Sequence, residues 1–161
     1  MTGPFGNIRG VRVKPDEELR RHTSFRIGGK ARYFVFVDSK RALRSVLAVT
    51  AAKKVSYFVI GAGTNILAAD AGFPGAVLKL SGTFTRVVRD NDRFRCGAGV
   101  LIDRFLSNAV SRGYAGAEFL AGIPGTLGGA VKGNAGAFGH AIGELVTAVR
   151  LMDANGGETV L

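Results

Sequence analysis

The chain has 161 residues, 47% of them hydrophobic and 21% charged, which is typical of a folded domain with its own core and excludes a disordered chain. No apolar run approaches the roughly 18 residues of a membrane helix, and the first ten residues lack the apolar segment of a secretory signal. The single cysteine, Cys96, excludes an internal disulfide and suits a reducing compartment, and with only two histidines a zinc site is not expected.

The net charge of +10 lies almost entirely in the N-terminal third of the chain. Residues 1–54 hold 13 basic and 4 acidic side chains, which gives +9, and residues 55–161 give only +1. Since the basic residues are scattered, we interpret them first as a solvated face and second as an attraction for an anionic small molecule. A nucleic-acid partner is least favoured, because no zinc knuckle, RNP aromatic signature or KH-type loop is found. We expect residues 1–21 to form a basic N-terminal tail.

The first half of the chain predicts a β–α–β unit. Residues 31–37 (ARYFVFV) are typical of a strand, and residues 39–52 predict a helix with Asp38 or Ser39 as its N-cap. The inner stripe of this helix is Leu43, Val46, Leu47 and Thr50. Residues 55–60 form a continuous apolar run that predicts a strand covered on both faces, and residues 76–80 predict a further strand.

The second half predicts antiparallel strands and one more helix. The segments FTRVVRD and RFRCGAG predict a pair that turns at residues 90–92, and residues 101–113 predict an amphipathic helix that ends at Gly113. Residues 145–153 predict a strand leading into a hairpin turn at 155–157. Since the returning strand has just begun at Leu161, we expect a piece of a longer chain.

These elements predict an α+β domain of two lobes, the first over about residues 22–80 and the second over about residues 81–161.

The segment GIPGTLGGAVKGNAGAFG, residues 122–139, holds seven glycines and one charged residue, Lys132. Glycine loses more conformational freedom on folding than other residues, so such a segment needs a structural reason. A flexible linker fits poorly, because apolar residues are interleaved through it. Leu127 and Val131, four residues apart, predict a short helical turn that Thr126 caps and Pro124 introduces.

The first glycine-bearing element is VIGAGTNI, residues 59–66, where a buried strand leads into a tight turn. Successive backbone amides in such a turn bind anions, most often phosphate, and Thr64 and Asn65 could add donors. The alternative is a junction whose glycines only satisfy turn geometry. The Rossmann fingerprint fails, because Ile66 stands at the third glycine position and no acid follows about 20 residues on. A Walker loop fails as well, for want of Gly-Lys-Ser/Thr.

The second element lies within the glycine-rich segment. Gly128, Gly129 and Ala130 would let a flat ring or a pyrophosphate come into contact with the main chain, and Asn134 would bond a ligand atom or brace the loop. Together the two elements indicate a dinucleotide-like cofactor.

Three motifs, HTSFRIGGKARYFV, VIGAGTNIL and LAGIPGTLGGAVKGNAGAFG, resemble in order and spacing the flavin-binding half of the UDP-N-acetylenolpyruvoylglucosamine reductases. The resemblance implies a two-lobed FAD-binding domain of the vanillyl-alcohol-oxidase type, with FAD bound non-covalently and NADPH as hydride donor. It also implies a cytoplasmic step of peptidoglycan precursor synthesis, with UDP-N-acetylglucosamine enolpyruvate as the substrate and neither a nucleic acid nor a membrane as a partner.

The resemblance places cofactor-binding residues in both glycine-bearing elements, and the N-terminal motif residues Thr23 and Phe25 near the cofactor. The pyrophosphate loop would comprise Val59, Ile60, Gly61, Ala62, Gly63, Thr64, Asn65 and Ile66. The loop around the phosphates and the ring would comprise Gly122, Ile123, Pro124, Gly125, Gly128, Gly129, Ala130, Asn134, Ala135 and Gly136.

Catalytic residues are not expected in this chain. Reduction of an enol ether beside a carboxylate needs a proton donor and positive charge for the enolate. The family resemblance assigns these roles to an Arg in a Tyr-Arg-x-Ser segment and to a Ser and a Glu in a substrate domain, and none of these is found up to Leu161. The chain alone is therefore expected to be inactive.

Other titratable residues are given minor roles. Glu118 is expected to bond loop amides, and Glu144 is the second local acid. Arg26 and Lys132 could hold anionic groups or lie at the surface, and covalent flavin attachment through His22 or His140 is not expected. The alternatives are another flavin-dependent oxidase or dehydrogenase and, least favoured, a basic nucleic-acid-binding module.

Overall fold

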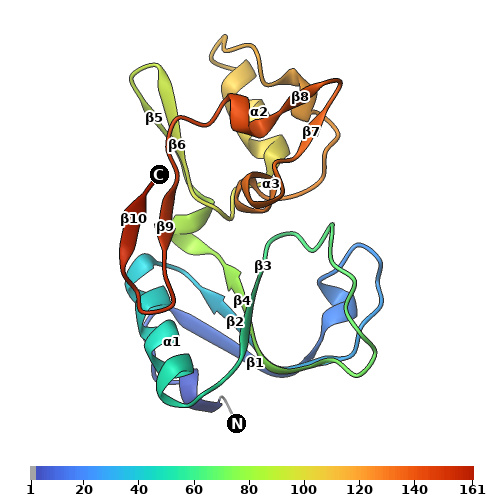
Figure 1. Cartoon of the computed structure of the whole chain (residues 1–161), viewed down its shortest axis with the longest axis vertical. Coiled ribbons are helices and arrows are strands. Elements are labelled where there is room, and N and C mark those ends of the chain that lie inside the picture. The colour runs from blue at the N-terminus through green and yellow to red at the C-terminus, as the bar shows by residue number, and fades with distance from the viewer. Residues whose placement is uncertain (1–2) are drawn as a thin grey trace.

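The computed structural model describes residues 3–161 and shows two lobes of mixed α and β structure, one above the other in Figure 1. The lower lobe is built on a four-stranded sheet, and the upper lobe on short helices and two-stranded hairpins. This confirms the predicted α+β class. Within residues 3–161, no helix is both long enough and apolar enough to cross a membrane.

The sheet of the first lobe has the strand order β1-β2-β4-β3. Its strands are β1 (Val11–Glu18), β2 (Lys30–Val37), β3 (Tyr57–Ile60) and β4 (Phe73–Leu80). β1 pairs antiparallel with β2, whereas β2, β4 and β3 run parallel. The carboxyl ends of the three parallel strands therefore meet at one edge, which faces the second lobe (Figure 1).

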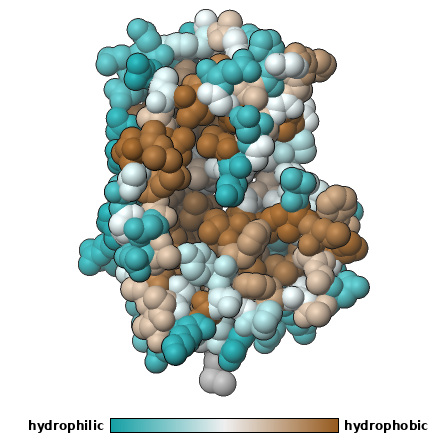
Figure 2. Space-filling model, in the orientation of Figure 1, coloured by the Kyte–Doolittle hydropathy of each residue, from teal (hydrophilic) through white to brown (hydrophobic). Residues whose placement is uncertain are grey.

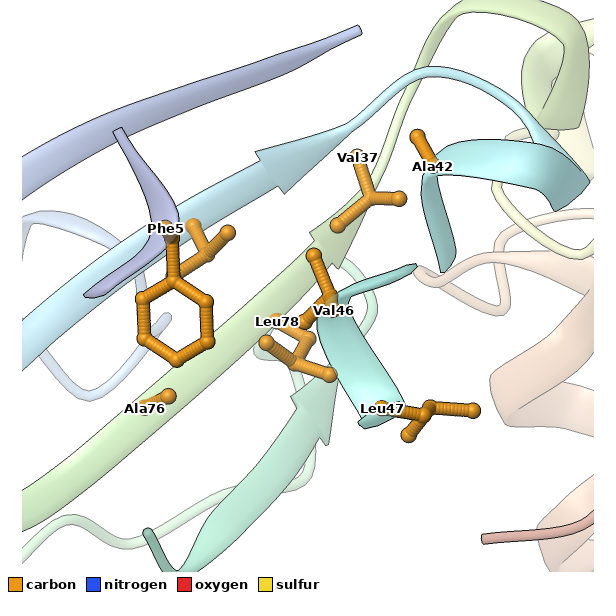
Figure 3. Packing of buried hydrophobic residues seen from close by; sticks show 8 residues of the cluster. Phe5, Val37, Ala42, Val46, Leu47, Ala76 and Leu78 are labelled. Carbon is orange, nitrogen blue, oxygen red and sulfur yellow. The ribbon is translucent and has the colours of Figure 1, made fainter. Parts of the chain in front are cut away.

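Helix α1 (Lys40–Ala52) covers one face of this sheet. It begins where predicted, because the Ser39 hydroxyl accepts a hydrogen bond from the Ala42 amide at 3.3 Å. Figure 3 shows the core between helix and sheet. The buried residues of this core are Phe5, Val35, Val37, Ala42, Val46, Leu47, Ala76 and Leu78.

The N-terminal residues do not form a tail over the described part of 1–21. Residues 11–18 are strand β1, which pairs with β2 along its length, and Phe5 is 0% exposed in the core. Half-buried and exposed side chains alternate at the start of this strand, as in a strand with one face on the core. Val11 and Val13 pack against the core beneath α1, and Arg12 between them is exposed. Arg12 and Lys14 therefore lie on the face of β1 that is turned away from α1. The high charge of the region made this alternation difficult to recognise in the sequence.

Strand β3 forms as predicted but is not covered on both faces. It is an edge strand, and Tyr57, Phe58 and Val59 are 38–47% exposed, so only Ile60 is buried. An apolar run shows that a strand can be buried, but its place in the strand order decides whether it is.

The second lobe follows β4. Strands β5 (Val87–Asp90) and β6 (Arg93–Cys96) pair as predicted and turn with Asn91 at a φ of 54°. Helix α2 (Ile102–Val110) ends three residues before Gly113, and α3 (Leu127–Gly133) is followed by the small hairpin β7 (Gly136–Ala137) and β8 (His140–Ala141). The core of this lobe contains Ile102, Leu120, Ala130 and Ile142. Short 3-10 turns lie at Gly3–Phe5, Leu19–Arg21, Gly82–Thr85, Glu118–Leu120 and Ile142–Glu144.

The last hairpin returns to the first lobe. Strands β9 (Arg150–Met152) and β10 (Glu158–Val160) lie beside α1 (Figure 1), and the Glu158 carboxylate bonds Lys40 at 2.9 Å and also Arg44. Met152 packs against the core of the first lobe. The second lobe therefore does not extend to residue 161, and the predicted strand over residues 145–153 is confined to three residues.

Candidate functional site

The glycine loop after β3 presents a row of free backbone donors. None of the amides of residues 62–68 donates a hydrogen bond to an acceptor within residues 3–161. Seven consecutive donors without partners, in a segment that carries no acidic side chain, match the needs of an anion that offers several oxygen acceptors.

Contacts at the two glycines hold this loop in place. Gly63 has a φ of +73°, and a Cβ there would lie 1.9 Å from the His22 carbonyl oxygen. The Ser24 amide donates to the Gly63 carbonyl at 3.0 Å. A Cβ on Gly61 would lie 2.4 Å from Thr126 Oγ1. Gly61 is therefore held by the second lobe, and Gly63 by the N-terminal motif.

The two glycine-bearing elements meet across the lobes. Thr64 Oγ1 donates to the Pro124 carbonyl at 3.0 Å, and Gly61 lies against Thr126. In Figure 1, α3 stands directly above the upper end of β3. The segments are 60 residues apart in the chain, so their meeting agrees with a single site built from both.

Helix α3 is packed against a third segment that the sequence analysis did not assign to the site. Thr126 caps the helix by accepting from the Gly129 amide at 3.3 Å, which confirms the predicted cap. The Gly128 amide donates to the Ala98 carbonyl at 2.9 Å, and a Cβ on Gly128 would lie 2.7 Å from Ala98 Cβ. The sequence signal for this segment is the second Gly-Ala-Gly, residues 97–99.

Asn134 braces its loop. It ends α3 with a φ of 45°, and its Oδ1 accepts a hydrogen bond from the Gly143 amide at 3.1 Å. Of the two predicted roles for Asn134, the structure shows this one. Nearby, Cβ atoms added to Gly122 or Gly133 would have no atom within 4 Å, so the main chain at these positions lies open.

The N-terminal motif lies beneath the glycine loop. Thr23 is 7% exposed and donates to the Ile27 carbonyl at 3.2 Å, whereas Phe25 is 59% exposed. The His22 ring stacks on Phe34 with centroids 3.9 Å apart, and its Nε2 lies 2.9 Å from Glu17 Oε1. The motif thus joins the sheet to the loop.

Two carboxylates near the N-terminal motif and the glycine-rich segment, Glu17 and Glu144, have pKa values below the ordinary one. Burial alone would raise the pKa of Glu17, but hydrogen bonds from His22 and Lys14 outweigh it and lower that pKa. Hydrogen bonds to His140 and then to the Ala141 amide lower the pKa of Glu144.

The remaining titratable residues that the sequence singled out are not shown at a binding site. Glu118 accepts a hydrogen bond from the Gly116 amide at 2.7 Å, which confirms its predicted role. Arg26 and Lys132 are exposed. Burial raises the pKa of the Cys96 thiol to about 11, so the thiol is protonated and unreactive near neutral pH. Among residues 3–161, no cluster of three His, Cys, Asp or Glu side chains could hold a metal ion.

The space between the lobes is hollowed, and Figure 2 shows apolar surface on both sides of the hollow. The motif and the glycine loop also carry large exposed apolar side chains, namely Phe25, Ile27 and Leu67. A cleft with apolar walls and a row of amide donors fits a ligand that has a flat ring system and a diphosphate.

The fold and the site define a cofactor-binding domain that is not a Rossmann fold, and comparison with known proteins identifies its class. Residues 31–161 match the model of the FAD binding domain family. The chain belongs to this family, and its two-lobed α+β architecture is the FAD-binding fold of the vanillyl-alcohol-oxidase type.

Individual relatives carry one common name. The chain is 38% identical over 144 residues to a UDP-N-acetylenolpyruvoylglucosamine reductase of Clostridioides difficile, and covers 47% of that protein and 89% of its own length. It is 41% identical over 137 residues to the reductase of Syntrophotalea carbinolica, of which it covers 46%. The chain therefore spans about half the length of the curated relatives it matches.

Two solved structures resemble this chain in fold. The UDP-N-acetylenolpyruvylglucosamine reductase of Thermus caldophilus superposes with a TM-score of 0.80 at 32% identity, over 94% of this chain and 52% of that one. A flavoenzyme of caerulomycin biosynthesis superposes with a TM-score of 0.65 at 17% identity, which shows the likeness of fold alone.

Proposed function

We propose that this chain is the FAD-binding part of an enzyme that reduces UDP-N-acetylglucosamine enolpyruvate to UDP-N-acetylmuramate with NADPH. The proposal rests on the names of the relatives at 31–41% identity and on the site geometry. The observation that carries it is the meeting of the two glycine-bearing elements, where Thr64 and Thr126 join them.

Each element has its own part in holding FAD. The free amides of residues 62–66, with Asn65 beside them, would bind the diphosphate. Residues 122–125 and Gly129 would offer main chain to the phosphates and the ring, because a Cβ on Gly122 would have no atom within 4 Å and one on Gly129 would meet only Thr126 Oγ1. Gly128 and Ala130 would hold α3 in place against Ala98 and the core of the second lobe. Residues 134–136 would hold the edge of the ring site, which Asn134 keeps in shape through Gly143. Val59 and Ile60 would place the diphosphate loop at the carboxyl edge of the sheet.

When bound, FAD supplies two-electron redox chemistry between NADPH and the enolpyruvyl double bond. The residues of this chain bind and orient the cofactor and shield one side of it from water. The proton and the positive charge that the reaction needs come from residues outside the matched motifs. We therefore propose that no catalytic residue lies in this chain, and that the additional half present in the relatives supplies them.

The compartment follows from the same proposal. Reduction of a nucleotide sugar by NADPH belongs to the cytoplasm, and the single unreactive thiol suits a reducing environment.

Cofactor binding and turnover test this function separately. The purified chain should quench the fluorescence of added FAD to a saturable end point and retain a flavin absorbance band. With NADPH and the enolpyruvyl substrate, the chain alone should give no turnover above a flavin-only control. Absence of any FAD binding would refute the cofactor assignment, and rapid product formation would refute the assignment of the catalytic groups to another part of the enzyme.

A further inference from the structure

We propose that Lys79, on strand β4, is a binding residue for the diphosphate of FAD. This lysine lies outside every segment that the resemblance assigns to the cofactor. The inference rests on the proposed FAD-binding function, and the experiment below separates its failure from the failure of that function.

Lys79 stands beside the point where the glycine loop leaves the sheet. In the parallel ladder it pairs with Ile60, and Gly61 follows directly. It is the second-last residue of β4, so it lies at the carboxyl edge where the three parallel strands meet. Open parallel sheets bind ligands at this edge.

The side chain of Lys79 is on the face that the glycine loop covers. Side chains alternate along a strand, so Lys79 shares a face with Val77. Val77 belongs to the cluster of Phe34 and Ile60, and two residues of the loop, Ile66 and Ala68, pack against that cluster. The ammonium and the unpaired amides of the loop are therefore on the same side of the sheet.

Lys79 is half-buried without a counter-ion. Burial lowers the pKa of its amino group, and among residues 3–161 no carboxylate lies within ion-pair distance of it. The acid bound on this face, Glu17, is held by Lys14 and His22. A partly desolvated charge without a partner costs free energy, which a bound anion would recover.

The neighbouring cation, Arg12, lies against an aromatic ring. Phe36 pairs with Lys79 on its other side, and the Arg12 guanidinium lies 4.0 Å from the centroid of the Phe36 ring. Among the described residues of this row, Lys79 is therefore the cation without an aromatic or carboxylate contact.

The donor set indicates a diphosphate rather than a smaller anion. A carboxylate has two oxygens, whereas the loop offers a run of amides and Lys79 adds an ammonium with three more donors. No acidic side chain occurs over residues 61–69 to compete for them.

The experiment compares ligands with and without phosphates. FAD, ADP and riboflavin are each titrated, at two salt concentrations, into wild type, Lys79→Met and Lys79→Arg. The matched control is Lys53→Met, at the exposed end of α1. For Lys79→Met we expect the Kd for FAD and ADP to rise about ten- to hundredfold, the loss typical of one charge-assisted hydrogen bond, and the Kd for riboflavin to stay unchanged. The salt dependence of FAD binding should weaken, Lys79→Arg should retain most of the affinity, and Lys53→Met should behave as wild type.

Two results would overturn the proposal while leaving the proposed function intact. One is an unchanged Kd for FAD in a folded Lys79→Met variant, and the other is an equal loss for FAD and riboflavin, which would show a purely structural role. A wild-type protein that binds neither FAD nor ADP would instead overturn the FAD-binding function itself, and this inference with it.

Discussion

The two glycine-bearing elements use glycine for different reasons. In the loop after β3, a Cβ on Gly61 or Gly63 would lie within 2.4 Å of an atom of the protein itself. Along α3 and its flanks the pattern is mixed: Gly128 is pressed against Ala98, whereas Gly122, Gly133 and Gly139 have no neighbour within 4 Å. The first element needs glycine so that the two lobes and the N-terminal motif can close on it. In the second element, Gly122 and Gly139 have φ values of +80° and +83°, which favour glycine whatever lies nearby. Gly133 has neither a positive φ nor a neighbour, so it needs glycine only if something outside the chain approaches.

The largest effect is expected from Gly63→Ala. The backbone at φ +73° disfavours a side chain, and the new Cβ would lie 1.9 Å from the His22 carbonyl oxygen. The two costs together predict a loss of about 2–5 kcal/mol in the free energy of unfolding and an FAD affinity at least a hundredfold lower. Urea unfolding and FAD fluorescence titration measure these quantities. A stable variant that binds FAD normally would show that the loop is free to move and that its contacts do not shape the site.

Gly128→Ala should have the next largest effect. Its Cβ would meet Ala98 Cβ at 2.7 Å and the Ala98 carbonyl oxygen at 2.8 Å, so either α3 or the 97–100 loop must shift. We expect a loss of about 1–3 kcal/mol by urea unfolding, and recovery of part of it in the double variant with Ala98→Gly. No recovery would mean that the contact with Ala98 is not the cause.

Gly129→Ala and Gly133→Ala form a matched pair within α3. A Cβ on Gly129 would meet only Thr126 Oγ1 at 3.4 Å, and one on Gly133 would meet nothing within 4 Å. Because alanine favours a helix, both variants should be as stable as wild type or more stable, by about 0.5–1 kcal/mol. If Gly129 faces the cofactor, Gly129→Ala alone should raise the Kd for FAD, by about tenfold. Equal affinities in the two variants would remove Gly129 from the site.

The smallest effect is expected from Glu17→Gln, which weakens the support of the N-terminal motif under the loop. Loss of the hydrogen bonds with His22 and Lys14 should cost about 1 kcal/mol at pH 7. The pKa of Glu17 is lowered in the folded state, so its contribution is present above the unfolded value and is lost as the pH falls through the folded value. The stability gap between wild type and variant should therefore narrow below about pH 4. Glu144→Gln, whose side chain is 53% exposed, serves as the control and should change stability less.

The pattern of the sequence predicted most elements because they are locally determined. Ser39 and Thr126 cap the helices they were expected to cap, and the turn after Asp90 closes the predicted hairpin. The meeting of the two glycine-bearing elements could only be hypothesised, since it depends on contacts between Thr64 and Pro124, 60 residues apart.

The errors have a common physical cause, which is the position of an element in the sheet or between the lobes. Composition suggested a tail where Val11 and Val13 form a strand, and an interior strand where Phe58 lies at an edge. The strand order decides both, and no local pattern encodes it. Lys79 was not predicted from the sequence, because nothing in its neighbours along the chain shows that its ammonium has no ion-pair partner within residues 3–161.

The return of β9 and β10 to α1 has a mechanical consequence. The upper lobe is connected to the lower one by two chain crossings, one through the turn at Gly82–Thr85 and one just before Arg150, and the Glu158 carboxylate ties the second crossing down through Lys40 and Arg44. A body attached at two points can swing about the line that joins them but cannot twist or slide freely. Release of a bound flavin should therefore proceed by a tilt that parts the contact between Gly61 and Thr126, with the two crossings as the pivot.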